Sequence, residues 1–323
     1  MKLAQHAIPI IQRNGGGVFV RAPVSRILLN KGRAVGVQID NGGPRVMAPV
    51  VISNCGMNVT WNKLLPKVLA QKHGYDKLCK KIGPSFAGVS LFVGFDKTTQ
   101  DLNLPSTNMW IFPGDKIEDM DIEAKCKITK DSPPLLFLGF PSSKDPEYTK
   151  RNPGKGVASI ISAGTFDEFA EWQSGRVKKR GKEYEKVKKR ITDNLLEEMY
   201  KHFPQCRGHV AYTELGTPLT NKHYLGYERG EIYGLDHTTS RFGSARKKLS
   251  PVSPIPGLYF TGQDILTAGI TSAMTSGIFA AGAVLKRNLY FELRDESKRR
   301  RAREGKKGSS SSGGGGAGFK KNA

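Results

Sequence analysis

The sequence lacks several features that would assign its chemistry directly. Its four cysteines lie far apart and form no C-x-x-C pair: Cys55, Cys79, Cys126 and Cys206. That spacing excludes the common zinc motifs and a disulfide framework, and it fits a reducing compartment or simply inert thiols. The apolar run over residues 278–285 is broken by Gly282 and is far shorter than the roughly 20 residues that a membrane-spanning helix needs. The six histidines show no ligand spacing, so no metal site is predicted.

Acidic residues are also scarce. The chain has 29 of them against 51 lysines and arginines, a net charge of +22. Two basic runs, residues 176–190 and 294–321, hold much of this excess. Such runs suit nucleic acid or anionic lipid, and they are equally typical of a solvated surface. The stretch "ESKRRRAREGKK" is typical of a nuclear signal or an RNA-binding arm, and also of a solvated, disordered end. We predict no specific nucleic-acid partner.

β-rich blocks and helices alternate along the chain. Hydrophobic alternation and turn residues predict strands at 18–20, 24–29, 34–39, 50–52, 86–95, 108–112, 135–140, 157–163, 208–215 and 258–260. One helix is expected over 60–82 and a longer one over 176–203. This order indicates an α/β or α+β protein built from two intermingled parts.

The predicted helix over 176–203 is amphipathic and basic. Val187, Ile191, Leu195 and Met199 recur every four residues, and the first half is rich in lysine. A basic amphipathic helix can rest on an anionic membrane, with Trp172 as an interfacial anchor. The same pattern describes a surface helix with solvated lysines. We therefore predict peripheral membrane contact through 176–203 as one of two interpretations.

The stretch "GLYFTGQDILTAGITSAM" has the pattern of a ligand site. A strand ends just before Asp264, and a helix begins after Gly269 with the small residues Thr271 and Ser272. An uncovered helix start attracts anions or electron-rich atoms, and a carboxylate beyond a strand can accept hydrogen bonds from ligand hydroxyls. A reduced flavin cofactor suits both features: its polyol arm carries hydroxyls for the carboxylate, and its ring gains negative charge that the helix start favours. Alternatively, Asp264 or Thr271 only caps a packed helix.

That stretch resembles the C-terminal FAD-binding segment of the retinol saturase (all-trans-retinol 13,14-reductase) family, within the carotenoid isomerase and phytoene desaturase group of flavoproteins. "GGGVFVRAPVSRILLNKGRAVGVQIDNG…VMAPVVISNCG" resembles the adenine-side segment of this group. "ELGTPLTNKHYLGYERGEIYGLDHTTSRFG" resembles its "GTPLT…G.IYGL" segment. Together these stretches span residues 15 to about 290.

The resemblance implies a glutathione-reductase-like, Rossmann-type FAD/NAD(P)-binding domain, here incomplete, with an inserted α+β substrate domain. We expect FAD-domain segments at 1–54 and 216–293, the substrate-binding domain at 55–215, and a disordered basic tail at 294–323. The implied cofactor contacts are Val24 at the adenine, Gly262 and Asp264 at the ribityl-pyrophosphate region, and Gly269, Ile270 and Thr271 at the flavin pyrimidine edge. Thr217, Pro218 and Tyr233 would face the substrate. No residue is assigned as catalytic.

The implied activity is an FAD-dependent oxidoreductase acting on CH–CH groups, which reduces a C=C bond of a retinoid, carotenoid or other isoprenoid polyene. NAD(P)H is a candidate electron donor. Two alternatives are a carotenoid cis–trans isomerase that uses reduced FAD, and an inactive fragment that acts as a basic membrane- or nucleic-acid-binding module. A lipophilic polyene is the expected partner, and membrane association at the endoplasmic reticulum or a plastid is favoured over a free cytoplasmic location.

The sequence departs from the family at the pyrophosphate site. That site needs a βαβ unit with G-x-G-x-x-G, and the formal match at Gly313, Gly315 and Gly318 falls in a low-complexity run with no strand before it. We expect an N-terminally truncated chain, or a protein that has lost independent FAD binding.

Overall fold

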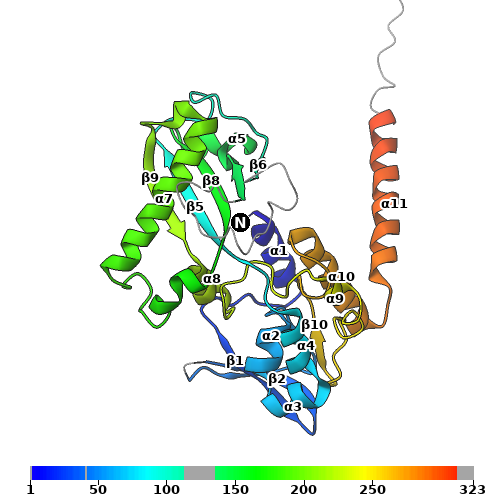
Figure 1. The fold of residues 1–323 in the computed structure, drawn as a ribbon. Helices are drawn as coiled ribbons and strands as arrows, with labels where there is room; N and C mark the ends of the chain where they lie inside the picture. The colour runs from blue at the N-terminus through cyan, green and yellow to red at the C-terminus, as the bar shows by residue number, and fades with distance from the viewer. Residues whose placement is uncertain (1, 41, 113–134, 311–323) are drawn as a thin grey trace, which may run out of the picture. The chain divides into compact units, whose positions relative to one another are not determined.

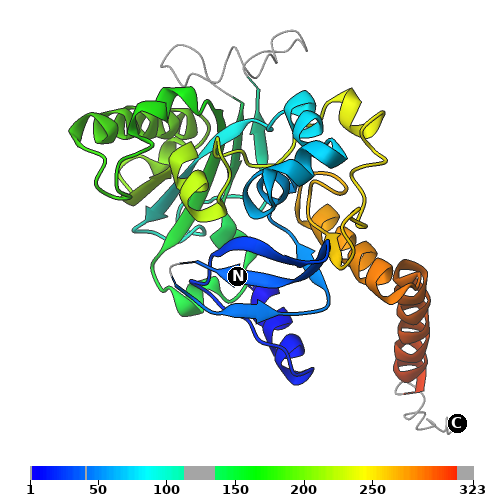
Figure 2. The same ribbon diagram turned by 90° about the horizontal axis from the view of Figure 1, so that it is seen from below.

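The computed structural model describes residues 2–40, 42–112 and 135–310. The chain folds into two compact units, one formed by Met1–Asn54 with Arg246–Ala323 and the other by Cys55–Ala245. The elements of both are labelled in Figure 1 and seen from below in Figure 2. The second unit is thus a continuous insertion between two segments of the first.

The first unit contains two small sheets. An antiparallel sheet has the order β1-β2-β3, formed by Val24–Asn30, Arg33–Ile39 and Arg45–Met47. A parallel pair joins β4 (Val51–Ser53) to β10 (Leu258–Phe260). The helices of this unit are α1 (Lys2–Arg13), α10 (Ile270–Leu285) and α11 (Leu289–Ser310).

The β1–β2 hairpin follows the sequence prediction. Asn30 pairs with Arg33, and the two residues between them, Lys31 and Gly32, have φ of 47° and 77°. Positive φ at both central residues is the geometry that matches the twist of a hairpin. The strand predicted at 18–20 was wrong. Phe19 and Val20 are 84% and 82% exposed and belong to no strand, because none of the described segments pairs with them.

The second unit is built on a five-stranded antiparallel sheet in which β5 (Ala87–Phe95) is paired on both sides. The order is β6-β7-β8-β5-β9. The other strands are β6 (Met109–Ile111), β7 (Leu136–Gly139), β8 (Gly156–Gly164) and β9 (Val210–Gly216).

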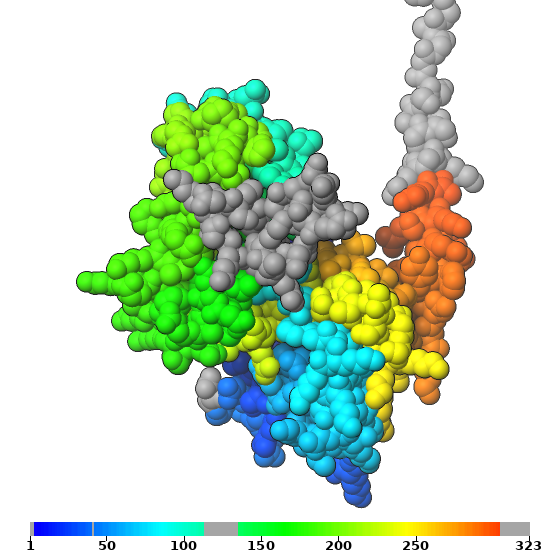
Figure 3. Space-filling view, in the orientation of Figure 1, coloured from blue at the N-terminus to red at the C-terminus, as the bar shows by residue number. Residues whose placement is uncertain are grey.

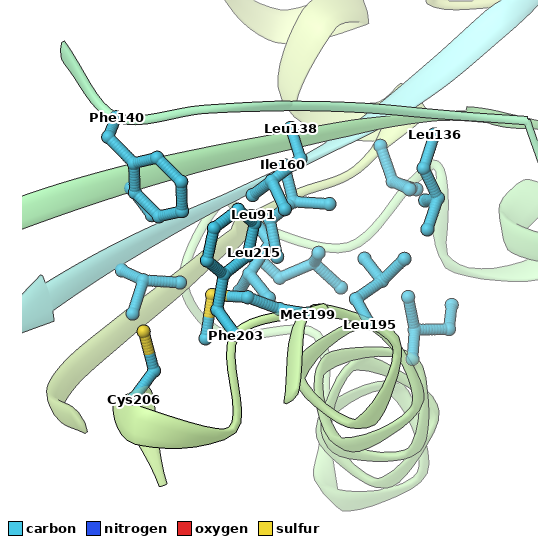
Figure 4. Close-up of a cluster of buried hydrophobic side chains, with 14 of the residues drawn as sticks. Leu91, Leu136, Leu138, Phe140, Ile160, Leu195, Met199, Phe203, Cys206 and Leu215 are labelled. Atoms are coloured by element: carbon cyan, nitrogen blue, oxygen red, sulfur yellow. The ribbon is translucent and has the colours of Figure 1, made fainter. Parts of the chain in front are cut away.

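Helix α7 (Lys182–His202) packs on this sheet and closes the core. As predicted, its Ile191, Leu195 and Met199 are buried. Figure 4 shows Leu195 and Met199 facing strand residues that are also buried, namely Leu91, Leu136, Leu138, Ile160 and Leu215. Each such side chain contributes roughly 1.5–3 kcal/mol when it leaves water, so the stripe at four-residue spacing fixes the helix on the sheet.

Helix α7 starts later than predicted, at Lys182 instead of residue 176. Gly181 precedes it with φ of 94°, which is outside helical geometry. Several of its exposed cations are paired with acids: Lys186 with Glu183, Lys189 with Asp193, and Arg190 with Glu168. Trp172 is partly buried against Tyr184, with ring centroids 5.6 Å apart.

Shorter helices complete the second unit. They are α2 (Met57–Val59), the π-helix η1 (Thr60–Leu64), α3 (Lys67–His73), α4 (Tyr75–Ile82), α5 (Pro141–Lys144), α6 (Tyr148–Arg151), the 3-10 helices η3 (Asp167–Trp172) and η4 (Pro204–Cys206), α8 (Pro218–Leu225) and α9 (Thr239–Phe242). The single helix predicted over 60–82 is therefore interrupted, at Pro66 and at Gly74, whose φ is 71°. Neither residue suits the interior of an α-helix.

The inserted unit extends beyond the predicted boundary at residue 215. Residues 216–245, expected with the FAD-domain segments, lie in the second unit. The amide of Ile232 donates to the carbonyl of Phe86 (3.2 Å), and the amide of Ser85 donates to the carbonyl of Gly234 (2.7 Å). These bonds tie 230–235 to the chain entering β5, more than 140 residues earlier, and local sequence patterns carry no sign of such pairing.

The tail is ordered further than predicted. Residues 294–310 continue α11 instead of being disordered, and Glu296 pairs with Arg300 one turn later. Such i,i+4 pairs and a run of good helix formers support an exposed helix. The remainder of the predicted tail, 311–323, and Cys126 lie outside the described residues. Within the described ranges, no helix has both the length and the apolar character that a membrane crossing requires.

Candidate ligand site at the β10–α10 loop

The parallel pairing of β4 and β10 brings two strand ends to one edge. Ser53 and Phe260 are opposite each other as the last residues of these strands. Asn54 follows β4, and the segment from Thr261 to Asp264 follows β10. The amide of Thr261 donates to the carbonyl of Ser53 (3.0 Å), which holds the loop over the strand end. In open parallel sheets this edge is where ligands bind.

Ser276 fixes the loop to helix α10. Its side chain is fully buried, and its hydroxyl oxygen accepts a hydrogen bond from the amide of Gly262 at 2.7 Å. The same oxygen lies 3.0 Å from the hydroxyl of Thr261 and donates to the carbonyl of Ala273. One serine therefore connects strand end, loop and helix. A sequence prediction centred on the helix start overlooked it, although Ser276 falls on the face two turns from Gly269.

Gly262 is a position where only glycine fits. Its φ is 98°, and a Cβ placed there would lie 2.1 Å from Oδ1 of Asn54. The two strand ends therefore approach each other closely, with no room for a side chain between them. Asn54 is the second residue that the sequence prediction did not single out, although it completes the "SN" at the end of β4.

The carboxylate and the helix start predicted for ligand contact lie on this same loop. Asp264 is 2% exposed, and the amide of Ile265 donates to the carbonyl of Gly262 (3.2 Å), which makes a tight turn around it. Gly269 precedes α10 with φ of 96° and ψ of 167°. The first bond of the helix runs from the amide of Ala273 to the carbonyl of Gly269 (3.0 Å).

The start of α10 is open. A Cβ at Gly269 would meet no atom within 4 Å, and Ile270 is 66% exposed. Ahead of the first helical bond, the amides of Ile270, Thr271 and Ser272 have no acceptor within the helix, and they carry the positive end of its dipole. The helix start thus offers backbone donors beside open space, with the buried Asp264 on the same loop. Backbone donors at an open helix start fit an electron-rich ring such as the flavin end of FAD.

Val24 lies elsewhere in the first unit. It is the first residue of β1, in the antiparallel sheet, and pairs opposite Ile39 next to an irregularity in the strand register. Its predicted contact with adenine stays a prediction. The structure groups the remaining cofactor candidates, from Gly262 to Thr271, on one strand–loop–helix segment.

The three substrate candidates lie in the second unit. Thr217 is fully buried and caps α8, exchanging hydrogen bonds with Thr220, and its hydroxyl is 2.8 Å from that of Tyr184. Pro218 is the first residue of that helix, a position suited to proline. These contacts are those of a helix cap. The ring of Tyr233 is edge-on to Phe86 and its amide donates to Ser85 (2.9 Å), and its substrate role stays a prediction.

A cleft of about 720 Å³ opens beside this segment of the second unit. Its walls include Ser85, Phe86 and Phe166, and its rim carries Arg229 paired with both carboxylate oxygens of Asp167 at 2.8 and 2.9 Å. The part of the chain that the structure describes contains no group of three or more His, Cys, Asp or Glu side chains able to hold a metal ion.

Comparison with known proteins gives a consistent relationship. The chain is 38% identical over 302 residues to the all-trans-retinol 13,14-reductase of Rattus norvegicus and 36% identical over 309 residues to that of Homo sapiens. The matches cover 90% and 93% of this chain. The resemblance to the all-trans-retinol 13,14-reductases is confirmed. The chain spans about half the length of these curated relatives, 49% and 50%.

The chain is also similar to two proteins at lower identity. A Danio rerio protein named inactive all-trans-retinol 13,14-reductase is 31% identical, and the chloroplastic prolycopene isomerase of Daucus carota is 26% identical over 274 residues. No protein-family profile matches the chain.

Solved structures show the fold. An oxidoreductase from Methanosarcina mazei aligns with a TM-score of 0.52 at 19% identity, over 86% of this chain and 52% of its own. A putrescine oxidase variant from a study of cofactor binding aligns with a TM-score of 0.53 at 15% identity, over 87% of this chain and 52% of its own. The mixed α/β fold of the chain is therefore shared with about half of each of these proteins.

Proposed function

We propose that the chain is part of an FAD-dependent oxidoreductase of the retinol saturase type, which reduces a C=C bond of a retinoid, carotenoid or other isoprenoid polyene. The similarity to all-trans-retinol 13,14-reductases over nine-tenths of the chain supports this proposal most strongly. The open start of α10 supports it independently, because its backbone donors suit the electron-rich ring of a flavin.

In this proposal, different residues of the β10–α10 loop contact different parts of the cofactor. Asp264, which is buried at the end of β10, would accept hydrogen bonds from cofactor hydroxyls, as the family resemblance implies. The amides at the start of α10 would donate toward electron-rich atoms of the ring and favour negative charge there. Gly269 lets the ring approach the backbone, since no Cβ intervenes. When bound, FAD would supply the hydride chemistry, while the protein orients the polyene and excludes water.

The pyrophosphate end of FAD needs groups that the described residues do not provide, since the glycine-rich turn is absent from them. The decisive test is to purify the chain alone and in a form extended upstream in its genomic locus, and to record the visible absorbance of each. Flavin bands in the extended form alone support the proposal. If neither form binds flavin, the proposal fails, and the basic-module alternative replaces it.

A cis–trans isomerase is the second candidate, because the chain is also similar to a prolycopene isomerase. The 35–38% identity to the reductases against 26% to the isomerase favours the reductase. Product mass separates the two, since saturation adds two hydrogens to the polyene and isomerisation adds none. An unchanged product mass with altered geometry would replace the reductase by the isomerase.

A further inference from the structure

The corner between α10 and α11 carries a surface that the flavin site does not use. Helix α10 ends at Leu285, Lys286 follows in the left-handed region with φ of 55°, and the chain turns into α11 at Leu289. The amide of Arg287 donates back to the carbonyl of Gly282 (3.0 Å). A Cβ on Gly282 would lie 2.7 Å from the Arg287 carbonyl, so this turn is closely packed and its geometry is fixed.

A cleft of about 390 Å³ lies in this corner. Its walls combine apolar and cationic groups, including Ile278, Phe279, Ala283, Lys286, Leu289 and Tyr290. Aromatic rings continue from the cleft onto α11. Phe279 and Tyr290 have centroids 6.3 Å apart, and Tyr290 and Phe291 5.7 Å apart.

Large apolar side chains remain exposed around the cleft. Leu285 is 55% exposed, Leu293 52%, and Tyr290 and Phe291 each 48%. Arg294 lies over the ring of Phe291 at 4.8 Å, so a cation borders this apolar patch directly. Aromatic rings beside cations are the residues that proteins place at the boundary between lipid and water.

The rest of α11 supplies concentrated positive charge. The described acids of this helix are paired: Glu292 with Arg287, Asp295 with Arg294, and Glu296 with Arg300. Four further cations, Lys298, Arg299, Arg301 and Arg303, have no ion-pair partner among the described side chains. The pKa of the Glu296 carboxyl is lowered, chiefly by its hydrogen bond with Arg300 and also by the neighbouring arginine charges.

Residues Tyr290, Arg294, Lys298 and Arg301 share one face, because they are spaced by three or four along the helix. No acid lies on that face between them. Figure 3 shows α11 as a column whose outer turns are not covered by the rest of the first unit on the side in view. The exposed fractions agree, since the described residues from Lys298 to Arg303 are all exposed.

We propose that this corner and the face of α11 that carries Tyr290, Arg294, Lys298 and Arg301 bind an anionic phospholipid membrane. The exposed leucines and aromatic rings enter the headgroup boundary, and the arginines and lysines neutralise lipid phosphates and carboxylates. Nucleic acid would use the cations but has no need of Leu285 and Leu293, which favours lipid. The inference does not depend on the proposed enzymatic activity. It places the membrane contact on α11, whereas the cations of α7 are largely paired with acids.

The test is co-sedimentation of the purified chain with phosphatidylcholine vesicles, with and without phosphatidylserine. The variant replaces Arg294, Lys298 and Arg301, the cations of the proposed face, by glutamine. A charge-matched control replaces Lys186, Lys189 and Arg190 on α7 by glutamine. We expect binding only to phosphatidylserine vesicles, weakened at least about tenfold by the α11 variant and by added salt, and retained by the control.

A second variant, Phe291→Ser with Leu293→Ser, separates lipid from nucleic acid. It should weaken vesicle binding and leave any binding to duplex RNA unchanged. Equal sedimentation of wild type and the α11 variant would overturn the proposal, as would loss of binding in the α7 control alone. The proposal would also fail if the chain bound RNA tightly and the serine substitutions left vesicle binding unchanged. Helix α11 would then be a nucleic-acid-binding helix. Circular dichroism confirms that each variant is folded.

Discussion

The hydroxyl oxygen of Ser276 lies 2.7 Å from the backbone nitrogen of Gly262, which joins the middle of α10 to the loop after β10. Replacing Ser276 by alanine leaves this buried amide without an acceptor. We expect the free energy of unfolding to fall by about 1–3 kcal/mol, the cost of an unsatisfied buried donor. Urea unfolding measures this loss. The neighbouring Thr275→Ala, which removes only a bond to the Thr271 carbonyl, should change stability by less than about 0.5 kcal/mol. Equal effects would mean that the bond to Gly262 is unimportant.

Gly262 and Gly269 have nearly the same φ, 98° and 96°, but different surroundings. Gly269→Ala should lower the free energy of unfolding by about 1–3 kcal/mol, through backbone strain alone. Gly262→Ala should cost more, because Oδ1 of Asn54 lies where its Cβ would be. Thermal unfolding measures both.

The double variant Gly262→Ala with Asn54→Ala gives the control for this difference. When Asn54 is already alanine, Gly262→Ala should lower the free energy of unfolding by no more than Gly269→Ala does in the wild-type protein. If it does not, strain at Gly262 and not the close approach of the strand ends is the cause. In the flavin-binding form of the protein, Gly269→Ala should weaken FAD retention, because the methyl group occupies the open space beside the helix start.

Glu231 gives a pH-dependent prediction. Its side chain is buried and accepts a hydrogen bond from the amide of Arg229 (2.9 Å), and burial raises the pKa of its carboxyl. A raised pKa in the folded state means that the folded protein holds this proton more tightly than the unfolded chain. The stabilising contribution of Glu231 to the free energy of unfolding is fully present below the usual glutamate pKa of about 4.3. It is lost as the pH rises through the raised pKa of the folded state.

Glu231→Gln removes this titration and keeps an acceptor oxygen. We expect the stability of the variant, relative to wild type, to increase between pH 4 and pH 7, as measured by urea unfolding across about that range. Glu171→Gln, which removes an exposed carboxylate from the same unit, serves as the control for the loss of one negative charge. A flat difference for Glu231→Gln would contradict the assigned shift.

The described cysteines should differ in reactivity. Cys55 is exposed, whereas Cys79 and Cys206 are buried. Burial raises the pKa of the Cys206 thiol to about 11. It therefore forms about 300-fold less thiolate at neutral pH than a thiol with the usual pKa of about 8.5. Maleimide labelling followed by peptide mapping should modify Cys55 rapidly and Cys206 only after denaturation in urea. Rapid labelling of Cys206 in the native protein would contradict its burial in the core.

Local patterns in the sequence determined much of this structure. The turn at Lys31 and Gly32, the buried stripe of Ile191, Leu195 and Met199, and the strand–loop–helix around Asp264 all follow from residues a few positions apart. Backbone conformation and side-chain periodicity are short-range properties, so they can be predicted without knowing the fold. The resemblance to the retinol saturases also lies in such local stretches.

Tertiary structure alone decided which segments pair. Asn54 meets Gly262 across some two hundred residues, Ser276 accepts from an amide fourteen residues earlier, and residues 230–235 join the strand that begins at Ala87. The predicted strand at Phe19 failed for the same reason, since a strand exists only where a partner lies beside it. Pairing depends on how distant segments pack, and a pattern read along the chain gives the elements but not the contacts between them.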